Sequence, residues 1–147
     1  SSAFLPVFFS RLEGQTRLEK KSLDDRQEYI LQAKEIIYEN FWLGVGAGNY
    51  TAEVAQKNPT RPIWQIQPVH NVFLLVWAEL GAVGLLLLLI FLGVVFIESI
   101  KRNKTLVMLL YVSCFILCVV DHWLWSSHFG LIFLFLILGV NFKQIKD

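Results

Sequence analysis

Cysteine and net charge are both scarce in this sequence, and their scarcity excludes two classes of protein. The 147 residues include only two cysteines, Cys114 and Cys118, whose spacing provides neither a disulfide framework nor a C-x-x-C metal site. Because both lie in an apolar run, we expect them to be small buried hydrophobic residues. The formal net charge is only +1, so no basic excess attracts nucleic acid, and we expect no nucleic-acid partner.

The N-terminus also lacks the features of a secretion signal. The segment Ser1-Ser2-Ala3-Phe4-Leu5-Pro6 has no initiator methionine, no basic leader and no cleavage motif. We therefore expect the sequence to be a piece of a longer protein.

Long apolar runs are abundant. Hydrophobic residues make up 55% of the sequence and its mean hydropathy is +0.53, more than a typical soluble domain shows. The runs predict transmembrane helices at about 72–98 and 105–124, and a third at about 127–142 that is short for a full span. We predict an all-α fold in one domain, 1–147: a fragment of a polytopic membrane protein with an extracytoplasmic helical loop followed by two to three transmembrane helices.

Basic residues predict how the chain lies in the membrane. The segment 101–104 carries three of them between the first two spans, and Lys143 and Lys146 follow the third. The positive-inside rule places both clusters in the cytoplasm. Residues 10–69 and the turn at 121–128 would then lie on the outer side.

The outer segment predicts an amphipathic helix at about 23–40. Ser22-Leu23-Asp24-Asp25 has the S-x-x-D pattern of a helix start. Apolar residues then recur at helical spacing, at Tyr29, Ile30, Ala33, Ile36, Ile37 and Phe41. The glycines of segment 44–49 are expected to end this helix.

His70 is the first candidate for chemistry. It follows Pro68 and is expected to open the first transmembrane helix at the outer boundary, on the same helical face as Gly81 and Gly84. Glycines on that face permit close helix approach, so the face should point into protein. A neutral imidazole there can accept a proton near pH 7. The alternative is an interfacial histidine that makes a structural hydrogen bond.

Arg26 is the second candidate. It lies in the first turn of the predicted amphipathic helix, on the face of Ile30 and Ile37. A guanidinium there needs an anionic partner, and a phosphate group would suit its bidentate fork. An ion pair with an Asp or Glu of the chain is the alternative.

The stretch Gly44-x-Gly46-x-Gly48-Asn49 could present backbone N–H groups to a phosphate. It is not a dinucleotide-binding fingerprint, because a helix precedes it and no strand-turn-helix unit follows. The alternative is a loop that only ends the helix.

Polar residues also gather at the outer end of the last two spans, at Asp121, His122 and His128. With His70 they raise the alternative of a metalloenzyme. Because no ligand spacing on one helical face supports it, we expect no metal site.

Several of these features together resemble the O-antigen ligase and O-antigen polymerase family. His70-Asn71, followed after nine residues by Gly81 and Gly84, is similar to the H-N-x9-G-x-x-G signature of that family. The stretch 43–50 resembles its G-x-G-x-G-N-aromatic element, and Arg26 resembles the start of its arginine-led helix.

Two further segments bear on the resemblance. Asp121-His122-Trp123-Leu124-Trp125 is similar to the final segment of some bacterial members. Phe41-Trp42 departs from the family pattern, because many members carry a Pro-aromatic pair there.

The resemblance implies transfer of a glycan from a polyprenyl-diphosphate carrier to an acceptor hydroxyl, on a growing glycan or on lipid A-core sugar, with no cofactor. It implies that His70 is the general base and that Arg26 contacts the diphosphate. The remaining candidates for substrate binding or for the site are Asn71, Gly46, Gly48, Asn49, Asp121 and His122.

The resemblance further implies a multi-pass protein of the bacterial inner membrane, surrounded by membrane lipid, with its site facing outward. Full-length members have more transmembrane helices, so we expect these 147 residues to be inactive alone. Two alternatives stay open: a non-enzymatic transport or assembly subunit, and a metalloenzyme that uses His70, His122 and His128.

Overall fold

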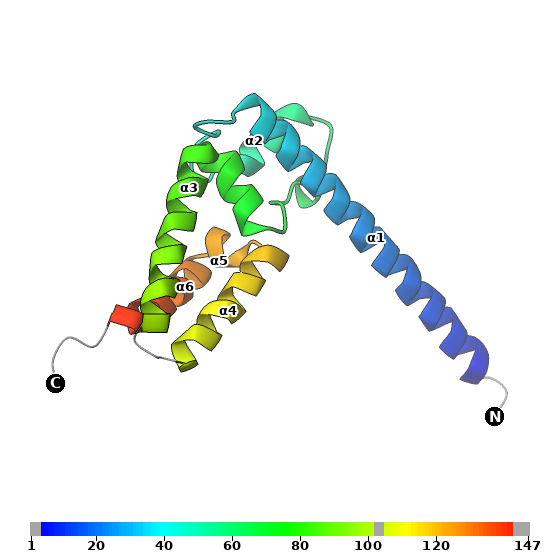
Figure 1. The fold of residues 1–147 in the computed structure, drawn as a ribbon. Helices are drawn as coiled ribbons and strands as arrows, with labels where there is room; N and C mark the ends of the chain where they lie inside the picture. Colours follow the sequence, from blue (N-terminus) through cyan, green and yellow to red (C-terminus); the bar gives the residue numbers. More distant parts are fainter. Residues whose placement is uncertain (1–3, 102–104, 143–147) are drawn as a thin grey trace.

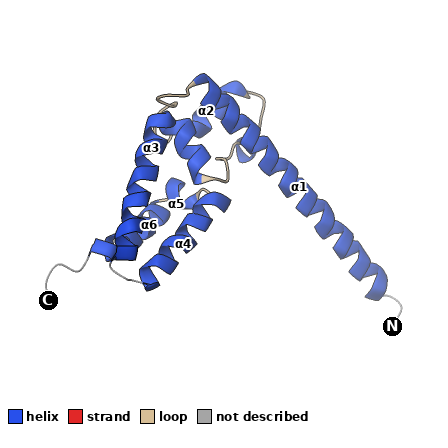
Figure 2. Ribbon diagram, in the orientation of Figure 1, coloured by secondary structure: helices blue, strands red, loops and turns tan. Residues whose placement is uncertain are grey.

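The computed structural model describes residues 4–101 and 105–142, and this part of the chain is helical, with no β-strand (Figures 1 and 2). The elements are α1 (Phe4–Glu39), α2 (Tyr50–Lys57), the 3-10 turn η1 (Ile63–Gln65), α3 (Val72–Lys101), α4 (Thr105–Val120), α5 (Trp123–Ser126) and α6 (His128–Phe142). The all-α prediction is confirmed.

The apolar helices agree with the expected membrane-protein fragment. Within the described residues, α3 is the one helix long and apolar enough to cross a membrane by length and composition, and α4 and α6 contain shorter apolar stretches. Segment 102–104, Lys143 and Lys146, on which the expected orientation depends, lie outside the described residues.

Helix α1 begins at Phe4, well before the expected start near residue 23, and ends at Glu39 as expected. The S-x-x-D pattern therefore lies inside the helix. Pro6 is tolerated because it lies in the first turn, where its missing N–H has no intrahelical partner. No other proline occurs before Pro59, so nothing in the sequence interrupts the helix. Figure 1 shows its N-terminal half extending away from the other helices.

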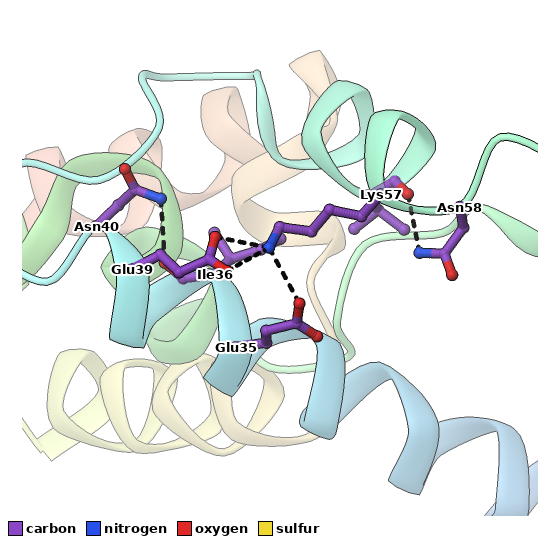
Figure 3. Close-up of polar contacts among 7 residues, drawn as sticks. Glu35, Ile36, Glu39, Asn40, Lys57 and Asn58 are labelled. Carbon is purple, nitrogen blue, oxygen red and sulfur yellow. Dashed lines mark hydrogen bonds and ion pairs between the residues drawn. The ribbon is translucent and has the colours of Figure 1, made fainter.

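The C-terminal half of α1 packs against α2 and the beginning of α3. The buried residues of this core are Tyr29, Ala33, Ile36, Ile37, Tyr50, Val54, Val69, Leu75 and Ala78. The helical spacing thus predicts the inward face of α1 correctly, except that Ile30 is exposed. Phe41, which the spacing also included, lies beyond the end of α1 and is exposed. At the surface, Lys57 Nζ lies 3.0 Å from Glu35 Oε1 and 2.6 Å from Glu39 Oε2, and these ion pairs tie α2 to α1 (Figure 3).

Helix α3 is broken at Gly81, where φ is 69° and ψ is −174°. The expected continuous span over 72–98 is therefore two helical segments, which run in different directions in Figure 1. The second segment, 82–101, is long enough by itself to cover a hydrocarbon core of about 30 Å. His70, Gly81 and Gly84 consequently do not share one continuous helical face.

The second half of α3 packs against α4 and α6. The buried residues there are Leu92, Val95, Cys114, Leu134 and Ile137. Both cysteines are buried and free, as expected. The second predicted span ends earlier than expected, because α4 stops at Val120 and Trp123–Ser126 forms the separate turn α5.

Candidate active site

A cavity of about 630 Å³ lies between α1 and the segment that leads into α3. Arg26 and His70 both line it, although 44 residues separate them in the chain. The rest of its lining is Leu18, Lys21, Ser22, Asp25, Glu28, Tyr29, Arg61, Trp64, Gln65 and Gln67. The structure therefore brings the two main candidates to one polar cavity.

His70 lies two residues before α3 and faces protein on several sides. Its ring centroid is 5.9 Å from that of Tyr29 and 5.0 Å from that of His122. Its Nδ1 lies 3.4 Å from Asp121 Oδ1, and 27% of its side chain is exposed. The imidazole is thus held by neighbours and still accessible from the cavity.

Asp121 follows directly after α4 and is a natural partner for His70. Burial alone would raise the pKa of Asp121, but hydrogen bonds from the His122 amide, at 2.6 Å, and from the His70 ring outweigh it and lower this pKa. The carboxylate is therefore ionised near neutral pH and can accept a hydrogen bond from a ring N–H group. An Nδ1–H of His70 that donates to it leaves Nε2 as the free acceptor.

His122 completes this group of three side chains. Its Nδ1 lies 2.7 Å from Ser126 Oγ, and its Nε2 lies 3.9 Å from Asp121 Oδ1. Burial, the largest cause, lowers the pKa of His122. Among the described residues, His128 is not part of this cluster.

The basic side chains of the cavity come from two segments. Arg26 makes no ion pair with any described residue, so the expected alternative of an Asp or Glu partner is not what the structure shows. Arg61, which no pattern in the sequence singled out, lines the same cavity and pairs with Glu28. It lies in a loop without helical periodicity, and its only signal was a basic residue between two prolines. Lys21 adds a third cation.

The glycine stretch lies against the break in α3. Val45 N donates to Ala78 O at 2.9 Å, and Gly46 N donates to Glu79 O at 2.8 Å. In return, Ala82 N donates to Phe41 O at 2.8 Å. The loop thereby satisfies backbone groups that an unbroken helix would pair internally.

The candidates Gly46, Gly48 and Asn49 are not among the described residues that line the Arg26–His70 cavity. The Asn49 side chain donates to Val45 O at 3.1 Å. Gly48 lines a second cavity of about 420 Å³, which Glu79 and Trp125 also line. Gly44, Gly46 and Gly48 all have positive φ, and this loop turns tightly without β-carbons.

The side-chain amide of Asn71 makes a hydrogen bond at each end, and these two bonds fix the backbone next to His70. Its Oδ1 accepts from Leu74 N at 2.9 Å, as a helix N-cap does, and its Nδ2 donates to Val119 O at 3.0 Å. The start of α3 is therefore fixed against the end of α4. This contact brings His70 next to Asp121.

Comparison with known protein families gives a match over more than half of the chain. The O-antigen ligase family matches residues 2–89. The matched segment contains Arg26, the glycine stretch and the segment from His70 to Gly84, and it ends before Asp121. No curated protein and no solved structure matches the chain.

Proposed function

The chain belongs to the O-antigen ligase family, which implies glycosyl transfer of the ligase or polymerase type, and from this premise we propose which residues carry the reaction. The full-length protein of which this chain is a part transfers a glycan from a polyprenyl-diphosphate carrier to an acceptor hydroxyl, at the outer face of the bacterial inner membrane. The observation that carries this proposal is the shared cavity: the guanidinium of Arg26, which pairs with no described acidic residue, and the accessible imidazole of His70 line the same space.

In the proposed reaction His70 is the general base. A sugar hydroxyl is a poor nucleophile until its proton is accepted, and Nε2 of His70 accepts it as the oxygen attacks the anomeric carbon. The imidazolium that forms is stabilised by the Asp121 carboxylate, 3.4 Å from Nδ1. Asp121 is therefore a positioning residue, which acts through His70.

Arg26 acts on the leaving group. As the new glycosidic bond forms, the bond between the anomeric carbon and the carrier diphosphate breaks, and negative charge grows on the departing oxygen. The Arg26 guanidinium, which makes no ion pair within the described part of the chain, can hold that charge through two parallel hydrogen bonds. Lys21 and Arg61 line the same cavity and add positive charge around the diphosphate.

A lipid-linked donor fits the position of the cavity, whose lining includes His70, two residues before the apolar helix α3. The second half of α3 exposes large apolar residues such as Leu86, Leu87 and Ile90. In a membrane this surface contacts lipid or further helices of the protein. A donor anchored by a polyprenyl chain would reach the cavity from the same layer.

The proposal is tested by replacing His70 with Ala in the intact protein and analysing the cell-surface glycans. We expect transfer to be lost while the protein stays in the membrane; His128→Ala serves as the matched control. Accumulated carrier-linked polymer would indicate a ligase, and accumulated single repeat units a polymerase. Unchanged glycans in the His70→Ala strain would instead favour a non-enzymatic transport or assembly role.

A further inference from the structure

His70, Asp121 and His122 form a compact set of metal-ligating side chains. One nitrogen or oxygen from each lies within 4.8 Å of the other two. His70 Nδ1 and His122 Nε2 lie 3.4 Å and 3.9 Å from the same oxygen, Asp121 Oδ1. Zinc bound tetrahedrally by nitrogen and oxygen at about 2.1 Å separates its ligand atoms by about 3.4 Å. Small side-chain rotations would therefore bring all three into coordination.

The surroundings of His122 orient it for this role. Its Nδ1 lies 2.7 Å from Ser126 Oγ, and Ser126 is tied back to His122 O at 3.2 Å. A neutral histidine whose one ring N–H donates a hydrogen bond to an oxygen has a free lone pair on the other ring nitrogen. Metal-bound histidines are held in this way by their outer neighbours. Here the lone pair of Nε2 is on the side of Asp121.

We propose that His70, Asp121 and His122 bind a zinc ion, and that the bound ion inhibits glycan transfer. Two imidazoles and a carboxylate suit zinc, and three protein ligands leave a fourth position for water. Inhibition follows from the tautomer of His70. A neutral imidazole coordinated through Nδ1 carries its proton on Nε2, so Nε2 donates and no longer accepts the proton of the acceptor hydroxyl. The binding step stands on the geometry alone, and the inhibition step rests on the proposed function.

Binding is tested with cobalt, which absorbs visible light when tetrahedrally coordinated. The intact protein is purified in detergent, stripped with a chelator and titrated with Co²⁺. We expect one bound Co²⁺ per chain, displaced by Zn²⁺ and lost in His122→Asn. His128→Asn is the matched control and should bind as the wild type does, because His128 lies outside the cluster. Absence of cobalt absorption in the wild type, or its persistence in His122→Asn, would overturn the site.

Ser126→Ala provides a second variant that keeps all three ligands. Loss of an outer hydrogen bond to a metal-bound histidine weakens metal binding by about 10-fold to 100-fold. We expect a loss of this size in the cobalt titration, even if His122→Asn fails to fold. Unchanged cobalt affinity in a folded Ser126→Ala protein would contradict the proposed orientation of His122.

Inhibition is measured as transfer activity against Zn²⁺ concentration, with each variant compared to its own metal-free rate. We expect wild type and His128→Asn to be inhibited alike, and Ser126→Ala to need at least about tenfold more Zn²⁺. Cobalt binding without inhibition by zinc would overturn the inhibition step and count against His70 as the base. Inhibition that is equal in wild type and Ser126→Ala would place the inhibitory zinc elsewhere and overturn the proposal.

Discussion

The backbone of Gly81 lies directly against the backbone of Trp42. A β-carbon on Gly81 would overlap the Trp42 carbonyl, and one on Gly44 would overlap the Glu79 carbonyl. Two glycines from distant parts of the chain thus allow one close approach, at which the loop after α1 pairs with the broken helix α3. The glycine elements of the family resemblance meet at this contact.

The first prediction concerns Gly81→Ala. The substitution puts a β-carbon at positive φ and into the Trp42 backbone, so we expect it to destabilise the protein by at least about 2 kcal/mol. Gly93→Ala is the matched control, because a β-carbon at Gly93 meets nothing within 4 Å. It should change stability by no more than about 1 kcal/mol. Thermal unfolding in detergent compares the two. Equal melting temperatures would show that the contact is not required.

Local periodicity predicted much of this fold, and it failed where the backbone departs from regular geometry. Tyr29, Ala33 and Ile37 recur at helical spacing, so the inward face of α1 could be read from the sequence. The break at Gly81 could not be read from the sequence, because the apolar run continues through it and a glycine alone does not mark a helix break. It depends on backbone hydrogen bonds to a loop about 40 residues earlier in the chain, such as the bond from Ala82 N to Phe41 O.

The candidate site divides in the same way. Arg26 and His70 could be singled out from the sequence, because each was expected on a helix face that packs against protein, where a charged or titratable side chain needs a partner. The pairing of His70 with Asp121 spans 51 residues, and no period in the sequence encodes it. It depends on how α3 and α4 pack against each other. That packing is determined by the side-chain volumes of many residues together.

The second prediction separates the two hydrogen bonds of Asn71. Asn71→Asp keeps an oxygen that caps α3 through Leu74 N and loses the donor to Val119 O, whereas Asn71→Ala loses both. We expect Asn71→Ala to cost about 1–2 kcal/mol of stability and Asn71→Asp clearly less. Both should lower transfer activity, because the contact with α4 places His70 beside Asp121. Unfolding and transfer assays on the same preparations measure this. Full activity in Asn71→Asp would show that the Val119 bond does not position His70.

The third prediction concerns Asp121. Asp121→Asn cannot stabilise the imidazolium of His70, so we expect kcat to fall by on the order of 100-fold while KM for the donor changes little. Asp24→Asn, at an exposed position of α1 outside the cavity lining, is the matched control. Steady-state kinetics with a defined donor separate the two constants. A rise in KM with kcat unchanged would mean that Asp121 contributes to binding and does not act through His70.

The last prediction concerns Arg26. If its guanidinium holds the diphosphate through two parallel hydrogen bonds, Arg26→Lys keeps the charge and loses the fork, and we expect transfer to fall by about 10-fold to 100-fold. Transfer by the Arg26→Ala variant should fall further, because this substitution also removes the charge. Lys34→Ala is the control, since Lys34 is exposed on the same helix and does not line the cavity. Single-turnover transfer from a lipid-linked donor measures the chemical step directly. Equal rates for Arg26→Ala and Lys34→Ala would remove Arg26 from the leaving-group role. Arg61 and Lys21, the other cations among the described residues that line the cavity, would then be the candidates for it.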